Sequence, residues 1–346
     1  MKIINLKKTK REIRRVFRNI FEAPYAFFDQ MFATFYYDHF LAKKIVFFIG
    51  DLPISEKCAI YLVFSPDGLT RGHLESLKYL ISENYSPIVV SNAPLSAEEL
   101  DMVRPMSYQV IIRPNFGYDF GGYRDGILTL YSNRHKINRI ALLNDSCWFP
   151  LPNSFSWLSF AEALNVDFTS ALTHAGPNWY EVVLKSNNSS KNLTKHRKFF
   201  HYCSFALLFS KGAIQRSDFW NFWKNLKISS SKDRTVRFGE RALSTFMFQN
   251  SFTHQPMISE DLIASTLTDL PSCNHTKEVQ NFLKNGGWPA YSLREYLYIS
   301  FGFMFMKKRF NGDFITTEDP FLSNVLKIIS LPLTDRKSTP PSRRGH

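Results

Sequence analysis

The sequence predicts an α/β fold built on an open, mostly parallel β-sheet with helices on both faces. Four apolar runs have the length of strands and lack the alternation of polar and apolar residues that a half-exposed sheet shows. Segments with a helical period of apolar residues separate them, which is typical of strand–helix–strand units. The four runs are Lys57–Ser65, Pro87–Asn92, Tyr108–Asn115 and Arg139–Asp145.

Local signals support the elements in chain order. The first run ends in the turn sequence SPDG, and the helix after it carries its apolar residues on one face. The helix after the second run begins with Ser96 and has Glu99 three residues later, which is a capping box. Later in the chain we expect two strands, at Asp167–Thr173 and within His201–Ile214. Two helices are also expected there, one in SDFWNFWKNL with Ser217 as its cap and one at Phe238–Asn250 that begins near Glu240.

Length and composition allow a large folded domain with extensions at both ends. The chain has 346 residues, of which 44% are apolar, so it can bury a substantial core. We expect the α/β domain over residues 55–275 and a C-terminal helical segment over 276–334. Residues 1–54 are expected to form a basic amphipathic helical segment, because lysine and arginine interleave with aromatic residues there. The tail 335–346 has the composition of a disordered end.

The chain is basic, with 43 lysines and arginines, 30 acidic residues and a formal net charge of +13. This charge favours an anionic partner: a membrane surface, a nucleic acid or a phosphorylated substrate. Proteins that bind nucleic acid interleave basic and exposed aromatic residues along one face, whereas the clearest basic clusters here lie at the chain ends. We therefore expect no nucleic acid, and we expect the N-terminal segment to contact an anionic membrane surface. A helix packed on the domain with a solvated basic face explains the same residues.

Cysteine spacing and hydropathy bear on the compartment. The four cysteines have no C-x-x-C spacing, which indicates neither a zinc site nor a disulfide framework: Cys58, Cys147, Cys203 and Cys273. The N-terminus lacks the apolar stretch and cleavage site of a secretory signal. No run reaches the roughly 18 to 20 apolar residues of a spanning helix. These patterns predict a cytoplasmic protein, peripheral on the inner face of the cell membrane.

Two motifs follow the third and fourth predicted strands. The first, RPNFGYDFGGYRDGI, spans Arg113–Ile127, and the second, NDSCWFP, begins at Asn144. Ligands of open α/β sheets bind beyond the carboxyl ends of the strands, so we expect both motifs side by side at that edge. Asn115, Gly117 and Asp119 suit a nucleotide site because glycine lets backbone approach a ligand closely. The same glycines can instead shape a tight turn.

Asp145 ends the fourth apolar run at this edge. A carboxylate there can hold a divalent cation that bridges a diphosphate, because such cations keep open positions for phosphate oxygens. The alternative is an aspartate that caps the next turn. The sequence has no G-x-x-x-x-G-K-[ST] and no G-x-G-x-x-G, so it does not support the phosphate loops of ATPases or dinucleotide-binding folds.

The motif pair, RPNFGYDFGGYRDGI followed by LLNDSCWFP, resembles that of the rhamnan synthesis protein F family, bacterial polysaccharide-assembly proteins related to GT-A glycosyltransferases. The similarity covers approximately Lys57 to Gln255. It implies a GT-A-like domain that transfers a sugar, with inversion, from a nucleotide-sugar to a bacterial surface polysaccharide, lipopolysaccharide or lipid-linked glycan. Rhamnose is suggested by the family's name alone. A catalytically silent sugar-binding or assembly subunit on the same fold is the alternative.

The resemblance also implies roles for residues of the first motif. Asn115, Gly117 and Asp119 match the segment that lies against the nucleotide and the sugar of the donor. Arg124 and Asp125 lie one helical turn farther on and are included among the donor-binding residues.

In the second motif, Asp145 matches the final acid of the D-x-D element, which holds Mn²⁺ or Mg²⁺ and the diphosphate. Asn144-Asp145-Ser146 departs from that pattern because it supplies one carboxylate. Either Asn144 and Ser146 add neutral oxygen ligands, or arginine and lysine neutralise the diphosphate instead.

An inverting transfer needs a general base near the acceptor hydroxyl. Glu240 is the first choice, because we expect it to open a helix whose N-terminal dipole keeps a carboxylate ionised; an acid that serves the dipole alone is the alternative. Glu260 and Asp261 are the rival pair. Five further residues suit sugar contacts as well as ordinary packing: Trp148, His174, Trp179, Tyr180 and His201.

The stretch Asn285–Phe310 joins aromatic and apolar residues to Lys307, Lys308 and Arg309. We expect it to pack against the N-terminal helix and to form one membrane-facing surface with it. A buried C-terminal helix explains the apolar residues equally well.

Overall fold

The computed structural model describes residues 29, 31–174, 200–259, 303–310, 313–314, 328 and 331–333. A seven-stranded sheet in the order β1-β4-β3-β2-β5-β10-β7 forms its centre. The strands are β1 (Val46–Ile49), β2 (Lys57–Val63), β3 (Ser86–Ser91), β4 (Gln109–Ile112), β5 (Arg139–Asn144), β7 (Phe168–Ser170) and β10 (Ala206–Ser210). Strands β4, β3, β2 and β5 run parallel, whereas β1 and β10 pair antiparallel with their neighbours. The predicted α/β class with an open, mostly parallel sheet is confirmed.

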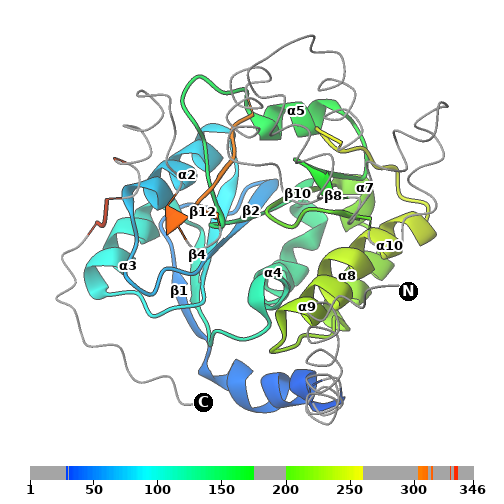
Figure 1. Ribbon diagram of the computed structural model, residues 1–346, viewed down its shortest axis with the longest axis horizontal. Coiled ribbons are helices and arrows are strands. Elements are labelled where there is room, and N and C mark those ends of the chain that lie inside the picture. The colour runs from blue at the N-terminus through cyan, green and yellow to red at the C-terminus, as the bar shows by residue number, and fades with distance from the viewer. Residues whose placement is uncertain are drawn as a thin grey trace, which may run out of the picture.

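Helices cover both faces of this sheet (Figure 1). The helices packed on one face are α2 (Arg71–Ser82), α3 (Ala97–Val103) and α5 (Trp157–Ala163). Those packed on the other are α4 (Tyr118–Thr129), α7 (Lys211–Ile214), α8 (Ser217–Lys224) and α10 (Ala242–Gln249), and the short helix α9 (Lys232–Thr235) precedes α10. Along β2, Ala59 and Tyr61 join the first core while Ile60 and Leu62 join the second. Because successive side chains of a strand point to opposite faces, an unbroken apolar run fills both cores.

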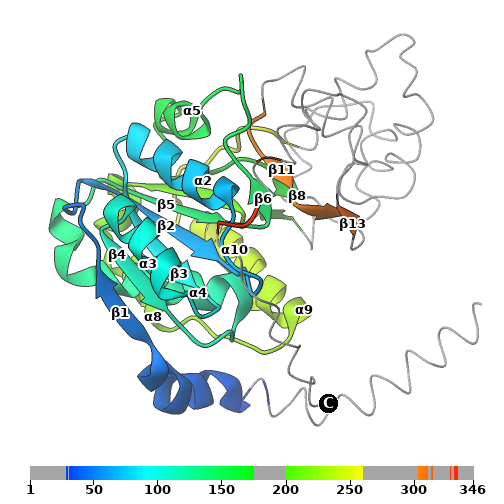
Figure 2. The same ribbon diagram turned by 90° about the vertical axis from the view of Figure 1, so that its left-hand side faces the viewer.

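Short strands gather beyond one end of the sheet (Figure 2). They form three antiparallel pairs: β6 (Cys147–Trp148) with β11 (Met306–Lys307), β8 (Thr173–His174) with β9 (His201–Tyr202), and β12 (Arg309–Phe310) with β13 (Asp313–Phe314). The first pair directly follows the end of β5, so it fixes chain segments around the carboxyl end of that strand.

The predicted capping box of α3 is confirmed. The backbone N–H of Glu99 donates to Ser96 Oγ at 3.2 Å, and the backbone N–H of Ser96 donates to Glu99 Oε2 at 2.8 Å. These bonds satisfy N–H groups at the start of the helix that have no partner inside it. Within the described part of the chain, no helix combines the length and the apolar character needed to cross a membrane.

The sequence predicted a helical segment over residues 1–54, but this prediction is wrong at Val46–Ile49, which forms a strand. Residues 31–44 are helical, with a π-helical turn at Tyr37–Leu41 and a 3₁₀ turn at Ala42–Lys44, but Val46–Ile49 forms the edge strand β1. The reason is the β-branched and aromatic composition of this run, which favours a strand. Pairing with β4 also covers backbone groups that would otherwise be exposed at the sheet edge.

The helical prediction for residues 276–334 is wrong over the described stretch 303–310, which is extended. The side chains at 303–306 are buried in the core on the α5 side of the sheet, where the rings of Phe305 and Trp157 lie 5.8 Å apart. The backbone N–H of Leu151 donates to Met304 O at 3.1 Å. Backbone pairing with the segment after β5 and aromatic packing therefore stabilise an extended strap, which we define as residues 303–308.

Candidate functional site

The carboxyl end of β5 lies between β2 and β10, near the middle of the sheet. Asn144, the last residue of β5, donates its backbone N–H to Phe205 O at 3.2 Å. Asp145 donates its backbone N–H to Leu62 O at 3.0 Å. These bonds hold both residues at the edge where ligands of α/β sheets bind, in the place that the sequence predicted.

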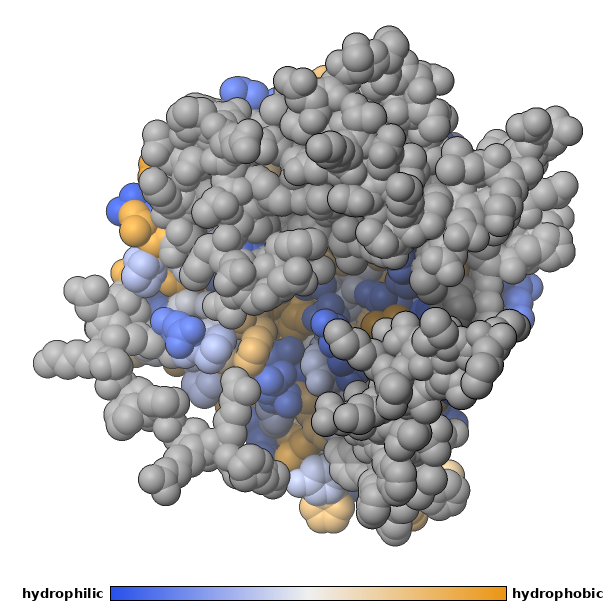
Figure 3. Space-filling view, viewed as in Figure 1, coloured by the Kyte–Doolittle hydropathy of each residue, from blue (hydrophilic) through white to orange (hydrophobic). Residues whose placement is uncertain are grey.

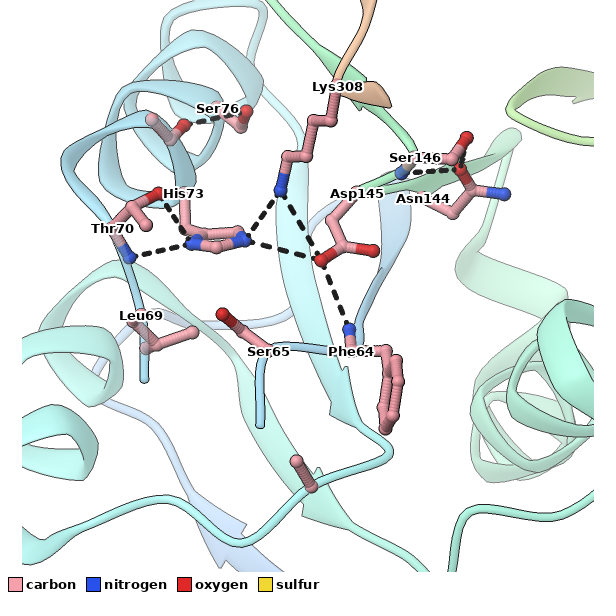
Figure 4. A network of polar contacts seen from close by, with 12 residues as sticks. Phe64, Ser65, Leu69, Thr70, His73, Ser76, Asn144, Asp145, Ser146 and Lys308 are labelled. Atoms are coloured by element: carbon pink, nitrogen blue, oxygen red, sulfur yellow. Dashed lines mark hydrogen bonds and ion pairs between the residues drawn. The ribbon is translucent and has the colours of Figure 1, made fainter. Parts of the chain in front are cut away.

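The carboxylate of Asp145 is the centre of a polar network (Figure 4). Its Oδ2 atom accepts a hydrogen bond from the Phe64 backbone N–H at 3.2 Å. The same oxygen lies 3.3 Å from His73 Nε2 and 3.4 Å from Lys308 Nζ. The aspartate side chain is 15% exposed and the lysine side chain 19%, so solvent and ligands can reach the pair.

His73 enters this network from the first turn of α2. The backbone N–H of Thr70 donates to His73 Nδ1 at 2.8 Å, so Nδ1 is the acceptor and Nε2 of the neutral ring carries the proton that faces Asp145. Burial lowers the pKa of His73, and the nearby positive charge of Lys308 lowers it further. The ring is therefore a neutral hydrogen-bond donor to Asp145 at neutral pH.

The pKa of Asp145 is lowered although burial acts in the opposite direction. The positive charge of Lys308 and the hydrogen bond from His73 outweigh the cost of burial, and the Phe64 N–H adds to them. Asp145 is thus an ionised carboxylate, neutralised in place by a lysine.

The residues at this edge do not fit the donor set of a resident Mn²⁺ or Mg²⁺. Such ions can bind through one or two carboxylates completed by waters and phosphates, and among the described residues no cluster of three or more His, Cys, Asp or Glu side chains adds further ligands. The neutral oxygens offered by the sequence are also engaged: Asn144 Oδ1 accepts from the Ser146 N–H at 3.1 Å and from its hydroxyl at 2.6 Å. The one carboxylate, Asp145, has an ammonium group beside it.

Lys308 was not expected here. The sequence predicted that it belongs to a membrane-facing basic end, but the strap brings it to the site. Its backbone N–H donates to Ser146 O at 2.9 Å, and its Nζ lies 4.2 Å from the centre of the Trp148 ring. His73 was also missed; its only sequence signal is its position three residues after Thr70 at a helix start. No local signal could have found Lys308, because its contacts join segments 163 residues apart.

The first motif reaches the same edge through Asp119. Asn144 donates from Nδ2 to Asp119 Oδ2 at 3.0 Å, so the two predicted motifs are joined directly. Asn115 is exposed in the loop before α4. Gly117 has φ +80°, a conformation that favours glycine, and it is buried where the chain enters the helix.

The other glycines of the motif serve packing. A Cβ on Gly122 would lie 2.3 Å from Leu62 Cδ1, and one on Gly121 would lie 2.5 Å from the backbone oxygen of Phe116. A Cβ on Gly126 would lie 2.7 Å from Ile60 Cγ2. Gly122 and Gly126 let α4 lie close against β2, and Gly121 leaves room for the turn at Phe116. The turn-shaping alternative therefore accounts for Gly121, and helix–strand packing accounts for the other two.

Arg124 and Asp125 are engaged with the N-terminal helix and with β4 rather than with Asp145. Arg124 pairs with Asp38 at 2.7 Å. Asp125 pairs with Arg113 at 2.6 Å and accepts a hydrogen bond from the Tyr37 hydroxyl. The structure therefore does not bring these two predicted donor-binding residues together with the rest.

Glu240 contacts β9 and the residues that follow it. Its Oε2 atom is 3.1 Å from His201 Nε2, and the Ser204 hydroxyl donates to Oε1. The prediction that Glu240 lies at the start of a helix is wrong. Helix α9 begins at Lys232, and Glu240 lies in the π-helical turn Val236–Arg241 that joins α9 to α10. The helix dipole therefore does not explain an ionised Glu240, because the dipole acts only within the first turn of a helix.

Glu240 is ionised for another reason. Burial opposes its charged form, but the hydrogen bond and charge of His201 and the hydrogen bonds of Ser204 lower its pKa below the usual range. Its side chain remains 18% exposed. The result is a fixed, ionised carboxylate at the rim of the site.

Tyr123 connects the two halves. Its buried hydroxyl donates to Ser204 O at 2.8 Å. Burial raises its pKa well above the usual value, and the nearby charges of Asp119, Glu240 and Asp145 add to that shift. The charges of the predicted site residues Asp119, Asp145 and Glu240 therefore all act on one tyrosine, although it lies in the first motif and was not singled out from the sequence.

The remaining predicted contacts are divided. His174 packs edge-on against His201, with ring centres 5.2 Å apart, and Trp148 is buried beneath Lys308. The others lie outside the described residues: Trp179, Tyr180, Glu260 and Asp261.

Comparison with known proteins gives one family. The family model of rhamnan synthesis protein F matches residues 87–282. Protein y4gN of Sinorhizobium fredii (strain NBRC 101917 / NGR234) is 26% identical over 235 residues, which are 68% of this chain and 57% of that protein. The chain thus spans little more than half the length of that relative.

Solved structures with some likeness include two mannosyl-transferring proteins. Core-mannan synthase A from Aspergillus fumigatus, in its Mn/GDP form, is 12% identical with a TM-score of 0.31, covering 55% of this chain and 69% of that one. The mannosyltransferase Ktr4p from S. cerevisiae is 10% identical with a TM-score of 0.30, covering 61% and 71%.

Proposed function

The chain belongs to the rhamnan synthesis protein F family, and on that premise we propose that it is a GT-A-like glycosyltransferase of bacterial polysaccharide biosynthesis. The donor is a nucleotide-sugar bound at the carboxyl end of β5, and the acceptor is a polysaccharide, lipopolysaccharide or lipid-linked glycan. The observation that carries the proposal is a pair of fixed carboxylates. Asp145 is held directly after β5, and Glu240 accepts a hydrogen bond from Ser204, whose backbone oxygen accepts one from the Tyr123 hydroxyl.

The donor half consists of the segments after β4 and β5. The Asp119 carboxylate is held by Asn144 at 3.0 Å and is suited to accept hydrogen bonds from ribose or sugar hydroxyls. The exposed loop at Asn115 offers backbone and amide groups to the nucleotide. The diphosphate is assigned to the Asp145 side of the edge, where a positively charged side chain is present.

The acceptor half is built around Glu240. An acceptor hydroxyl attacks the anomeric carbon of the donor, its proton passes to the Glu240 carboxylate, and the bond from the sugar to the diphosphate breaks. A single displacement of this kind inverts the anomeric configuration. Glu240 is suited to the role because it is ionised and accessible, and because His201 and Ser204 fix its orientation. Rhamnose is the first donor sugar to test, on the strength of the family name alone.

We further propose that the enzyme is cytoplasmic and works at the inner face of the cell membrane. The helix at residues 31–44 presents an aromatic face to solvent, defined by Met31, Phe32, Phe35, Tyr36 and Phe40, all about half exposed. Hydrophobic residues also show at the lower rim of the molecule, where Figure 1 places this helix (Figure 3). Its other side is held by polar contacts of Thr34, Tyr37 and Asp38 with the domain.

Charge favours an anionic membrane as the occupant of this aromatic face. Lys43 and Lys44 are exposed at the end of the helix, and residues 1–28 contain eight lysines and arginines against two glutamates. Basic residues next to exposed aromatic rings suit anionic lipid, which attracts the charges while the rings insert among the acyl chains.

Incubation with a panel of nucleotide-sugars, followed by measurement of nucleoside diphosphate release and of product configuration, tests the proposed function. Release that depends on an added glycan acceptor supports the enzyme. A chain that binds nucleotide-sugar without any turnover is instead a catalytically silent subunit. The ion pairs of Asp145 with Lys308 and of Glu240 with His201 are compatible with that alternative as well.

A further inference from the structure

We propose that Lys308 is the cation that binds the donor diphosphate. Of the two alternatives that the sequence left open, a metal held by Asn144-Asp145-Ser146 or basic side chains, this assigns the second to a single lysine. This inference rests on the proposed function, since it concerns the same donor. It makes nucleotide binding independent of metal, and it assigns an essential part of the site to the strap at residues 303–308.

The position of Lys308 is fixed by its backbone. β11 pairs with β6, and the Lys308 N–H donates to Ser146 O at 2.9 Å, directly after Asp145. Buried side chains from Phe303 to Met306 hold the strap in the core. Ordering a long side chain normally costs conformational entropy. Because the backbone of Lys308 is already fixed, less conformational entropy is lost when a ligand binds.

The ammonium group is held on two sides. Nζ lies 3.4 Å from Asp145 Oδ2 and 4.2 Å from the centre of the Trp148 ring. It also lies 3.0 Å from His73 Nε2, but both nitrogens carry protons, so this approach does not hold the ammonium. Trp148 and Asp145 attract the cation, whereas the neutral His73 ring presents its own N–H to Asp145 (Figure 4). Because the lysine side chain is still 19% exposed, phosphate oxygens can approach the ammonium from solvent.

A divalent cation at Asp145 would compete with this arrangement. It would have to bind the carboxylate that already faces an ammonium group at 3.4 Å, and the two positive charges would repel each other. A diphosphate is attracted by Lys308 and repelled by Asp145, so it has to approach the ammonium from the side that faces solvent, where lysine binds phosphate oxygens as a point charge. A metal would also need further oxygen ligands, and Asn144 Oδ1 is already engaged by Ser146, so the site favours an anion beside Lys308 over a metal beside Asp145.

The test is calorimetric titration of the full chain with UDP, GDP, CDP, dTDP and inorganic pyrophosphate, in EDTA and separately in Mn²⁺. We expect equal affinity for the bound nucleotide in both buffers. Lys308→Met should weaken binding on the order of 10- to 100-fold, the usual effect of losing a hydrogen bond to a charged group. Lys308→Arg should keep most of the affinity. Lys78→Met, which removes an exposed lysine of α2, is the matched control and should bind as the unmodified chain does.

Nucleotide binding that disappears in EDTA would overturn the proposal, as would normal binding by a folded Lys308→Met chain. The comparison of EDTA with Mn²⁺ needs no variant, so it tests whether nucleotide binding is independent of metal even if the Lys308→Met substitution prevents folding. If the unmodified chain binds none of the nucleotides in either buffer, the proposed function itself fails and the role of Lys308 falls with it. Nucleotide binding that requires Mn²⁺ refutes the role of Lys308 alone and leaves the proposed function intact.

Discussion

The Nε2 atom of His201 lies 3.1 Å from the Oε2 atom of Glu240, across the gap between β9 and the π-helical turn that precedes α10. This contact, together with the Ser204 hydroxyl on Oε1, keeps the carboxylate ionised in a largely buried place. It replaces the helix dipole as the physical basis for a base at this position.

Glu240→Gln should leave donor binding nearly unchanged and lower the rate of sugar transfer by roughly 10² to 10⁴, the usual contribution of a positioned general base. The amide retains a hydrogen bond to Ser204 but cannot accept the acceptor's proton. Transfer rates and donor affinity are to be measured on the same preparation. Glu75→Gln, at an exposed position of α2, is the control. Normal transfer by the Glu240 variant would direct the search for a base to Glu260, Asp261 or Asp125.

Asp125→Asn should destabilise the fold and spare nucleotide binding. Asp125 pairs with Arg113, whose side chain is fully buried, so the substitution leaves an uncompensated buried charge. Breaking such a pair costs about 3 to 5 kcal/mol of unfolding free energy, measurable by urea denaturation. Asp101→Asn, at an exposed site of α3, should have little effect. Unchanged stability with weakened nucleotide binding would instead restore the donor-binding role that the sequence suggested for Asp125.

Stability should fall as the pH is lowered below about 6.5, in part because of His73. Burial and Lys308 lower its pKa from the ordinary 6.5, so the unfolded chain binds a proton more readily than the folded one. The contribution is therefore fully present above the unfolded pKa and is lost as the pH falls through the folded pKa. Unfolding free energies measured between pH 5 and 8 by urea denaturation, a window of roughly one to two units around the unfolded histidine pKa, test this.

His73→Gln should flatten that pH dependence, because glutamine is the usual capping-box residue at this helix position and does not titrate. Some dependence should persist from His254, whose pKa burial also lowers. His135→Gln, at an exposed position, serves as the control and should keep the original slope. A His73→Gln chain with an undiminished slope would show that His73 is not the group responsible.

A double variant in which Phe35 and Phe40 are both replaced by serine should bind more weakly to vesicles that contain anionic lipid. The loss should be about tenfold or more for each ring, since burial of a Phe side chain stabilises by about 1.5 to 3 kcal/mol. Co-sedimentation with anionic and with neutral vesicles measures this. Phe155→Ser, which removes a ring that is 69% exposed outside the aromatic face, should not change binding. Equal binding by all three chains would contradict the membrane proposal.

Point substitutions are the appropriate test, because removing residues 1–44 would also remove Tyr37 and Asp38. Tyr37 donates a hydrogen bond to Asp125, and Asp38 pairs with Arg124. The truncated chain would therefore lose stability as well as the aromatic face. We therefore expect a chain that starts at residue 45 to be less stable than the full chain.

The sequence by itself determined the sheet and the position of its ligand edge. Unbroken apolar runs fit a sheet whose two faces are both covered. The residues directly after β4 and β5 must then lie at the same carboxyl edge, although β3 and β2 stand between the two strands. Asn144, Asp145 and Asp119 could be placed for this reason, and the hydrogen bond between Asn144 and Asp119 joins the two motifs.

The tertiary structure alone decided what these residues contact. Arg124 and Asp125 belong to the same motif as Asp119 but lie against the N-terminal helix and Arg113, because neighbouring positions of a helix point in different directions. Lys308 reaches Asp145 from 163 residues away. Local propensity and spacing describe contacts within a few residues, whereas this ion pair depends on an extended strap whose pairing and burial arise only when the whole core has formed.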